Sequence, residues 1–282
     1  MTAAAASSAG AAAHRHGSGE APFGAYAPTL LQRLLIDLAQ YTPLGRGSLR
    51  WGIAALLEQL RPGPIDVTRL GLKMRLHYYG GHYSEKKMLL KIDQYDREEI
   101  EHLTRDMEPD FHFVDIGAHT GMYAFAVKAK RPNAKVIAFE PNLRYAERLR
   151  FNIEANGFKD FALITAAAGA ERGTLPFYTE HDALNGQGPA IQVPVVNLYD
   201  TLTEHGFSRV DGLKIDIEGY EDRVLFPYFA SAPQPMWPRV LLMEYCQGNL
   251  WERDCLALCE SLGYRRIFSS ELNTVLVRDT SA

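Results

Sequence analysis

Glycines and one acidic residue follow an apolar, strand-like run near the middle of the chain. They lie in the segment Val114-Asp115-Ile116-Gly117-Ala118-His119-Thr120-Gly121, where a buried strand is expected to turn into a helix. Glycines at such a turn let the backbone approach a nucleotide-like ligand without a Cβ in the way. The spacing is G-x-x-x-G rather than G-x-G-x-x-G, and Asp115 precedes the first glycine. A carboxylate here repels a pyrophosphate but suits a cation-bearing ligand such as S-adenosylmethionine, although it can instead cap the next helix.

A second acidic residue, Glu140, ends the next predicted strand, 19 residues after Gly121. An acid at this place can accept hydrogen bonds from both hydroxyls of a ribose. Pro141 then stops the strand, and Asn142 can open the following helix. Strand, acid and helix start therefore arrive in the order expected for a ribose-bearing ligand.

Two further acids follow a third apolar strand, in the segment Leu213-Lys214-Ile215-Asp216-Ile217-Glu218-Gly219-Tyr220-Glu221. Ligands of open α/β sheets bind at the edge formed by the carboxyl ends of the strands. Period-two alternation along a strand would point Asp216 and Glu218 to the same side, with Glu221 about one turn further along the helix. We therefore expect Asp216 or Glu218 to have a functional role.

The elements that must position these residues alternate between strand and helix, which predicts an α/β fold with a mostly parallel sheet and helices on both faces. The segment from Gly173 to Val196 interrupts this alternation and reads as a substrate-side insertion with a mobile loop from Gly186 to Pro189. The last two strands are joined by Ser269-Ser270-Glu271 and predict a C-terminal antiparallel hairpin. The expected strands are Phe111 to Ile116, Lys135 to Phe139, Phe161 to Ala168, Gly212 to Ile217, Val240 to Tyr245, Tyr264 to Phe268 and Asn273 to Val277, and the expected helices are Met122 to Lys130, Leu143 to Asn156, Tyr220 to Phe229 and Leu250 to Leu262.

An N-terminal extension precedes this domain. Residues 1–22 are rich in Ala, Ser, Gly and His and predict a disordered tail, residues 23–105 an extension of helices and short strands, and residues 106–282 the ligand-binding domain. Leucines from Leu30 to Leu38 recur at helical spacing, and a second amphipathic helix begins near Ser48. We expect this leucine stripe to pack on the core or on a second copy of the chain, as a homodimer, rather than on a membrane surface.

Composition narrows the functional classes. The chain has 282 residues and a formal net charge of -4, with basic residues scattered among acids, so a nucleic-acid partner is disfavoured. The three cysteines, Cys246, Cys255 and Cys259, do not have zinc-site spacing and are expected to be reduced packing residues. No apolar run approaches the roughly 20 residues that span a bilayer, and no signal peptide is recognisable, so we predict a cytoplasmic protein without stable membrane insertion.

Taken together, the sequence resembles the FkbM-type methyltransferase family from roughly Tyr83 to the C-terminus. The resemblance rests on Phe113-Val-Asp-Ile-Gly-Ala-His-Thr-Gly121, Val136-Ile-Ala-Phe-Glu-Pro-Asn142, Asn152 with Asn156-Gly157, and Lys214-Ile-Asp-Ile-Glu-Gly-Tyr-Glu221. The last block is the most family-specific. One departure is His119, because the family usually has Asn there.

This resemblance implies a Rossmann-like class I methyltransferase fold and S-adenosylmethionine-dependent O-methylation of a sugar, a glycan or a secondary metabolite such as a polyketide. It also implies that Asp115, Gly117 and Gly121 hold the methionyl group, that Glu140 holds the ribose, and that Ala166-Ala167-Ala168 passes near the adenine. The cofactor-binding residues expected in all are Asp115, Gly117, His119, Gly121, Glu140, Pro141, Asn142 and Ala167.

Transfer of a methyl group to an alcohol also requires removal of the hydroxyl proton. The candidate bases are Glu218, Asp216, His119 and, more distantly, His82, and Glu218 is favoured. His119 can instead merely contact the cofactor in place of Asn. We predict no bound metal, although Mg²⁺ or Mn²⁺ held by Asp216, Glu218 and Glu244 is an alternative.

Two different classes of protein compete with a methyltransferase. A nicotinamide-dependent oxidoreductase would also use Glu140 to hold a ribose, but the missing middle glycine and Asp115 disfavour it. A binding protein could instead have kept the cofactor fold without catalysis. The acids at both predicted sites disfavour this second class without excluding it.

Overall fold

The computed structural model describes residues 20–43, 47, 49–79, 83–91, 96–178 and 189–278. Most of the predicted disordered tail, the loop that carries His82 and most of the loop from Gly186 to Pro189 lie outside these residues. At the end of the predicted tail, the carbonyl groups of Ala21 and Pro22 accept hydrogen bonds from the buried guanidinium of Arg75.

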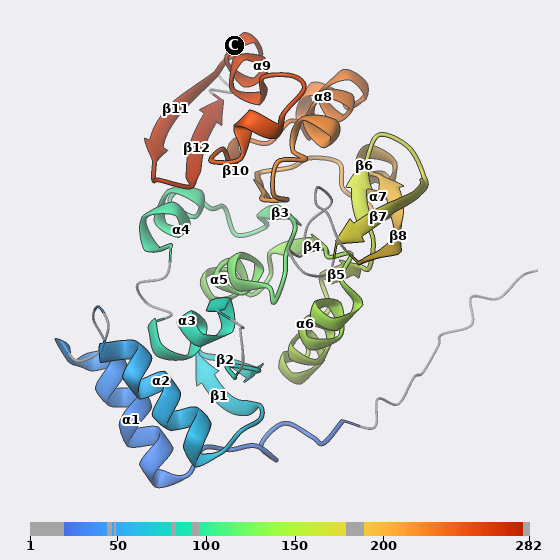
Figure 1. The fold of residues 1–282 in the computed structure, drawn as a ribbon. Coiled ribbons are helices and arrows are strands. Elements are labelled where there is room, and N and C mark those ends of the chain that lie inside the picture. Colours follow the sequence, from blue (N-terminus) through green and yellow to red (C-terminus); the bar gives the residue numbers. More distant parts are fainter. Residues whose placement is uncertain are drawn as a thin grey trace, which may run out of the picture.

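A seven-stranded sheet forms the centre of the molecule (Figure 1). Its spatial order is β11-β12-β10-β9-β3-β4-β5. The strands β10, β9, β3, β4 and β5 are parallel, and β12 is antiparallel to both of its neighbours. The bounds are β3 His112–Ile116, β4 Lys135–Phe139, β5 Phe161–Ile164, β9 Gly212–Ile215, β10 Val240–Glu244, β11 Tyr264–Ser269 and β12 Asn273–Arg278. The predicted mostly parallel sheet with a C-terminal antiparallel hairpin is confirmed.

Helices cover both faces of this sheet because its central strands are apolar on both sides. Phe113 and Val136 pack into the core beneath α5, whereas Val114 and Ile137 pack into the opposite core beneath α8. The helices are α4 Arg97–Leu103, α5 Met122–Lys130 and α6 Leu143–Asn156, followed by α7 Leu198–Glu204, α8 Asp222–Ser231 and α9 Cys255–Ser261. The chain between Gly248 and Cys255 forms only the short 3₁₀ turn η3 (Gly248–Leu250), so the predicted helix from Leu250 begins five residues too early. Asp254 caps α9 by accepting from two backbone N–H groups.

The strand order reverses between β3 and β9. From β3 the chain adds β4 and β5 on one side, and it later returns to add β9 and β10 on the other. The helices that follow β3 and β9 lie on opposite faces of the sheet, and a crevice forms at the carboxyl ends of strands where the connections part in this way. Both sequence segments singled out for chemistry, after β3 and after β9, meet at that crevice.

The predicted single strand from Phe161 to Ala168 is two strands in different sheets. It breaks after Ile164, and β6 (Ala167–Gly169) instead joins a three-stranded sheet of order β6-β8-β7. The other members are β7 (Gly173–Tyr178) and β8 (Ala190–Asn197), which pair antiparallel across the predicted insertion. The segment predicted as an insertion therefore belongs to a small sheet, and the first strand of this sheet, β6, follows β5 directly along the chain.

The N-terminal extension consists of α1 (Leu30–Tyr41), α2 (Leu49–Leu60), the hairpin of β1 (Ile65–Arg69) with β2 (Leu72–Leu76), and α3 (Tyr83–Lys91). Its hairpin docks on α6 through two side-chain amides. Asn152 both accepts from the backbone N–H of Arg75 and donates to its carbonyl, and Asn156 pairs in the same way with Lys73. The extension also shares one hydrophobic core with one face of the seven-stranded sheet, so the two are packed together.

Most of the leucine stripe of α1 does not pack on the core, contrary to one of the two packing modes expected from the sequence, although Leu35 does contact it. Leu30, Leu31 and Leu34 are 76, 51 and 58 % exposed, whereas the buried residues of α1 are Gln32, Ile36 and Ala39. Gln32 is buried because its side chain accepts from the N-cap residue Thr29 and closes a capping box. Among the described helices, none combines the length and apolar character that crossing a bilayer requires.

Candidate active site

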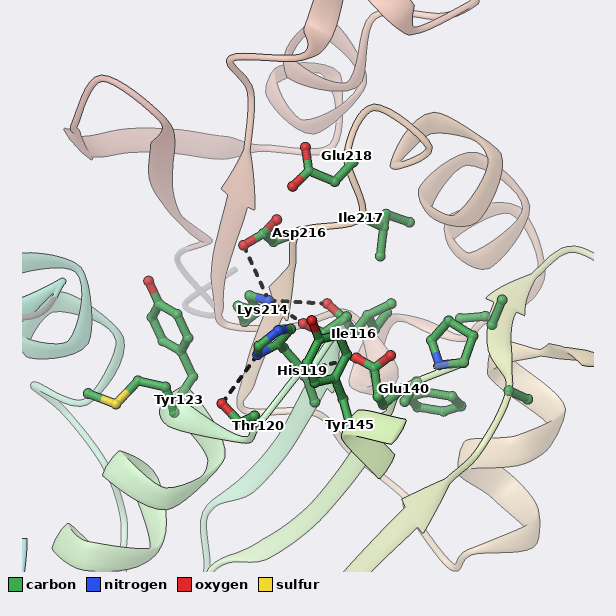
Figure 2. A pocket seen from close by; sticks show the side chains of 18 of the residues that line it. Ile116, His119, Thr120, Tyr123, Glu140, Tyr145, Lys214, Asp216, Ile217 and Glu218 are labelled. Carbon is green, nitrogen blue, oxygen red and sulfur yellow. Dashed lines mark hydrogen bonds and ion pairs between the residues drawn. The ribbon is translucent and has the colours of Figure 1, made fainter. Parts of the chain in front are cut away.

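A pocket of about 190 Å³ opens at the reversal of strand order, where the loops after β3, β4 and β9 converge (Figure 2). It contains five of the eight predicted cofactor residues, Gly117, His119, Glu140, Pro141 and Ala167, together with Asp216 and Glu218. Asp115, Gly121 and Asn142 are not among the residues that line it. The structure thus brings both acidic segments to one cavity.

The glycine-containing loop is locked between the two halves of the sheet. Gly117 has a φ of 73°, and a Cβ there would lie 2.0 Å from the carbonyl oxygen of Asp216. The N–H groups of Gly117 and Ala118 both donate to the carbonyl of Phe139 at the end of β4. Glycine is required at position 117 because two loops touch there, in addition to any approach of a ligand. Gly121, also left-handed, faces Leu149 in the same crowded way.

Asp115 is completely buried and does not reach the pocket surface. Its Oδ2 accepts from the N–H of Ala124 in the first turn of α5 at 3.2 Å, so the alternative helix-capping role is present. In the described part of the chain its Oδ1 has no hydrogen-bond partner. Burial raises the pKa of Asp115 to about 6, against the lowering effect of Lys214. A direct contact between Asp115 and a methionyl group would need the pocket to deepen, so its predicted role is indirect here.

Glu140 is fixed by the backbone on both sides. Its Oε2 accepts from the N–H of His119 at 2.7 Å, and its Oε1 accepts from the N–H of Asn142 at 2.8 Å. The side chain is 5 % exposed, and it still lines the pocket. A carboxylate that lines a pocket is a suitable acceptor for a pair of neighbouring hydroxyl groups.

His119 occupies the left-handed region with a φ of 51°. Asn, Asp and His tolerate this conformation better than most residues, which explains physically how His can stand where the resembling family has Asn. Its ring lies against Tyr145 with centroids 3.7 Å apart, and its Nδ1 is 3.2 Å from the hydroxyl of Thr120. Figure 2 shows it beside Tyr145 and Glu140, with Glu218 farther away beyond Asp216. This position suits contact with a cofactor better than proton removal near Glu218.

Three carboxylates gather at the other end of the site. One oxygen each of Asp216, Glu218 and Glu244 lies within 4.8 Å of the others. The sequence analysis expected Asp216 and Glu218 to point to the same side through the alternation of side chains along one strand. That reason is wrong, because β9 already ends at Ile215 and Glu218 has a left-handed backbone with a φ of 57°. The bend holds because the N–H of Glu218 donates to Glu244, while Gln247 donates to the Glu218 carboxylate at 3.1 Å.

The cluster has clear electrostatic consequences. Burial, with help from the Asp216 and Glu218 carboxylates, raises the pKa of Glu244 to about 8. Glu221 does not join the cluster, because its side chain turns inward to accept from Ile217 and the indole of Trp251. The three carboxylates are close enough to share one cation. This geometry does not decide between a bound metal and the metal-free site that the sequence analysis predicted.

Sequence reasoning missed several pocket residues: Ser84, Tyr123, Tyr145, Phe177 and Lys214. Phe177 and Tyr145 come from elements whose approach depends on tertiary packing, so no local pattern marks them. Lys214 had a signal, since a lysine between Leu213 and Ile215 in a central strand is unusual for a strand that is buried on both faces.

These features define an α/β protein with a buried acidic residue after β4 and an acidic cluster after β9, both at the point where the strand order reverses. Residues 115–252 match the model of the methyltransferase FkbM domain, which covers the glycine-containing loop, Glu140 and the acidic cluster. This part of the chain is therefore similar to a methyltransferase FkbM domain, and the cofactor predicted from the sequence, S-adenosylmethionine, agrees with that similarity.

Two curated relatives carry methyltransferase names. The chain is 26 % identical to 31-O-demethyl-FK506 methyltransferase FkbM of Streptomyces tacrolimicus, over 48 % of its own length and 64 % of that protein. It is 29 % identical to methyltransferase sdnD of Sordaria araneosa, over 40 % of its own length and 58 % of that protein. The chain thus spans less than two thirds of either relative.

Solved structures match at low TM-scores. They include TYW2 of M. jannaschii in complex with AdoMet, at 14 % identity and a TM-score of 0.41, covering 78 % of this chain and 88 % of that one. A SAM-dependent O-methyltransferase of Thermotoga maritima matches at 11 % identity and a TM-score of 0.40, covering 67 % and 66 %. The strand order of the chain itself is therefore the basis for describing its fold.

Proposed function

We propose that this chain is an S-adenosylmethionine-dependent O-methyltransferase that acts on a hydroxyl group of a small-molecule or glycan acceptor, such as a sugar or a polyketide-like secondary metabolite. The observation that carries the proposal is one pocket lined both by Glu140, which two backbone N–H groups fix, and by Asp216 and Glu218, whose carboxylates cluster with that of Glu244. Such a pocket offers a ribose site and a proton acceptor in one cavity.

The residues present fit the cofactor. Gly117 and the Glu140 carboxylate both line the pocket, and at Gly117 a side chain would collide with the loop that carries Asp216. Ala166, Ala167 and Ala168 line the opposite wall with small apolar side chains, and Phe177 adds a larger apolar surface. We assign Glu140 to the ribose and the alanine wall to the adenine.

When bound, S-adenosylmethionine supplies an electrophilic methyl group on a sulfonium. The chain's own task is to align an acceptor oxygen with that methyl group and to exclude water. Tyr145, Ile217 and Phe177 form apolar walls that serve the second purpose. Asp216 and Glu218, which line the same pocket, are the groups placed to orient the acceptor hydroxyl.

We assign proton removal to Glu218. Its carboxylate accepts a hydrogen bond from Gln247, its backbone is fixed by Glu244, and it is half-buried at the pocket edge, where an acceptor can reach it. As the acceptor oxygen gains the methyl group, its proton would pass to a Glu218 oxygen. Asp216, beside Lys214, is the second candidate, and His119 fits a cofactor contact better.

The acceptor class is supported by the name of one relative, a 31-O-demethyl-FK506 methyltransferase. An alcohol on an apolar scaffold is therefore the first class of acceptor to test, ahead of free sugars. A nucleic-acid acceptor is disfavoured by the net charge of -4.

The test begins with calorimetric titration of the purified protein with S-adenosylmethionine, S-adenosylhomocysteine and NAD. Binding of the two S-adenosyl ligands but not NAD is the expected result. Binding of NAD alone would support an oxidoreductase, and no binding would support a non-catalytic role. Mass spectrometry of 31-O-demethyl-FK506 and a panel of glycosides, each incubated with enzyme and cofactor, then reports whether a methyl group is transferred to oxygen.

A further inference from the structure

Lys214 is a buried lysine at the floor of the pocket. It is 3 % exposed, and its side chain comes from the central strand β9. Its Nζ donates to the carbonyl oxygen of Gly117 at 2.8 Å and lies 3.5 Å from that of Ile116 (Figure 2). A lysine in this position therefore holds the backbone of the glycine-containing loop from below.

The loop is held from its other side by β4. The N–H groups of Gly117 and Ala118 donate to the carbonyl of Phe139, whereas the carbonyl of Gly117 accepts from Lys214. The peptide groups around Gly117 are thus fixed by both neighbouring strands of β3. Loss of the lysine would leave the Gly117 carbonyl without this donor and free the loop on the β9 side.

The charge of Lys214 is balanced by two carboxylates. Its Nζ lies 3.8 Å from Oδ1 of Asp115 and 3.5 Å from Oδ2 of Asp216. Asp115 and Lys214 are direct partners in the register of β3 and β9, which explains why they meet. Burial by itself would lower the pKa of Lys214, but Asp216 and Asp115 together raise it above its usual value, so the lysine is charged.

We propose that Lys214 is a positioning residue for the cofactor: its ammonium fixes the Gly117 peptide in the ligand-binding form, and Asp115 is the buried counter-charge that keeps it there. The proposal rests on the proposed function, since it concerns S-adenosylmethionine binding. It gives Asp115 a role that its burial allows, acting through Lys214 and α5 rather than by touching the ligand.

A purely structural role makes a different prediction. If Lys214 only neutralised Asp115, removing both charges together would restore both the fold and the binding. If Lys214 positions the loop, removing both charges would restore the fold but not the binding. The pair Lys214→Met and Asp115→Asn therefore separates the two roles, because Asn retains an acceptor for the N–H of Ala124.

Lys128 offers a matched control. It is also a buried lysine, 1 % exposed, whose Nζ donates to two backbone carbonyls, those of Pro132 and Ala134. It lies on α5 outside the pocket lining. Lys128→Met should lower the melting temperature as Lys214→Met does, while leaving S-adenosylhomocysteine affinity within about threefold of wild type.

The experiment measures the dissociation constant of S-adenosylhomocysteine by calorimetry and the melting temperature for wild type, Asp115→Asn, Lys214→Met, the double variant and Lys128→Met. Because loss of one charged hydrogen bond commonly weakens binding about tenfold or more, the double variant should melt near Asp115→Asn yet bind about tenfold more weakly than it. If Lys214→Met does not fold, the double variant still decides, because the two buried charges leave together.

Equal binding by the double variant and Asp115→Asn would overturn the proposal and leave Lys214 as a counter-charge only. A loss of affinity in Lys128→Met as large as that in Lys214→Met would overturn it too, because general destabilisation would then explain both. Failure of the wild type to bind S-adenosylhomocysteine would overturn the proposed function and this inference together, which distinguishes that outcome from the first two.

Discussion

Glu140→Gln is the sharpest test of the cofactor site. The carboxylate accepts from His119 at 2.7 Å and from Asn142 at 2.8 Å, and it is almost completely buried. An amide of the same shape has one oxygen, so its NH₂ group must face one of these two backbone donors. Because a hydrogen bond to a charged group contributes about 1.5–3 kcal/mol, the variant should lose about 2 kcal/mol of unfolding free energy.

The same change should weaken cofactor binding. The ribose hydroxyls would lose a charged acceptor, and the loop that carries His119 would lose its anchor, so S-adenosylhomocysteine affinity should fall by about 30-fold, the equivalent of about 2 kcal/mol. Calorimetric titration and thermal melting measure the two effects. Glu147→Gln, an exposed position on the helix that follows, is the control and should change neither. Affinity of Glu140→Gln within about threefold of wild type would refute the ribose assignment.

Three further changes test other parts of the molecule. Glu218→Gln should leave S-adenosylhomocysteine affinity within about threefold but slow methyl transfer about 100-fold or more, since proton removal typically contributes that much; unchanged single-turnover rates would contradict this. Because the pKa of Glu244 is raised to about 8 in the fold, the stability it gives at low pH is lost as pH rises towards 8. We expect the unfolding free energy, measured with urea, to decrease between pH 5 and pH 8 in both proteins. The decrease should be smaller in Glu244→Gln than in wild type, by on the order of 2 kcal/mol. Leu34→Glu with Leu38→Glu should convert a dimer into a monomer in light scattering if the exposed face of α1 joins two copies, and an unchanged mass would count against that contact.

The sheet was predictable from sequence because its strands carry strong local signals. Lys135–Phe139 and the helices that begin at Met122 and Leu143 have the expected bounds, since each is a short apolar or amphipathic run with a clear start. Asn142 does cap α6, by accepting from the N–H of Arg144. Local patterns of this kind carry information about elements whose ends are fixed by nearby residues.

Features that depend on tertiary contacts were not predictable. No Gly, Pro, Asn or Asp marks the break in the strand after Ile164. The break is present because β6 pairs with β8 in another sheet. The sequence did not identify Gln32 as a buried residue of α1, whose side-chain oxygen and backbone N–H are paired with Thr29. Hydrophobic periodicity locates a helix but cannot decide which side meets the core when both sides are satisfied.

The two acidic segments form one site because of a contact that neither segment signals alone. Gly117 and Asp216 meet so closely that a single added carbon would lie 2.0 Å from the Asp216 carbonyl oxygen, and Lys214 donates to the carbonyl of the same glycine. Because the two loops are in contact, a movement of the loop after β9, which carries Asp216 and Glu218, would also displace the loop after β3. In this chain the glycine-containing loop and the loop that carries Asp216 and Glu218 are in direct contact, so residues that order one of these loops also set the geometry of the other.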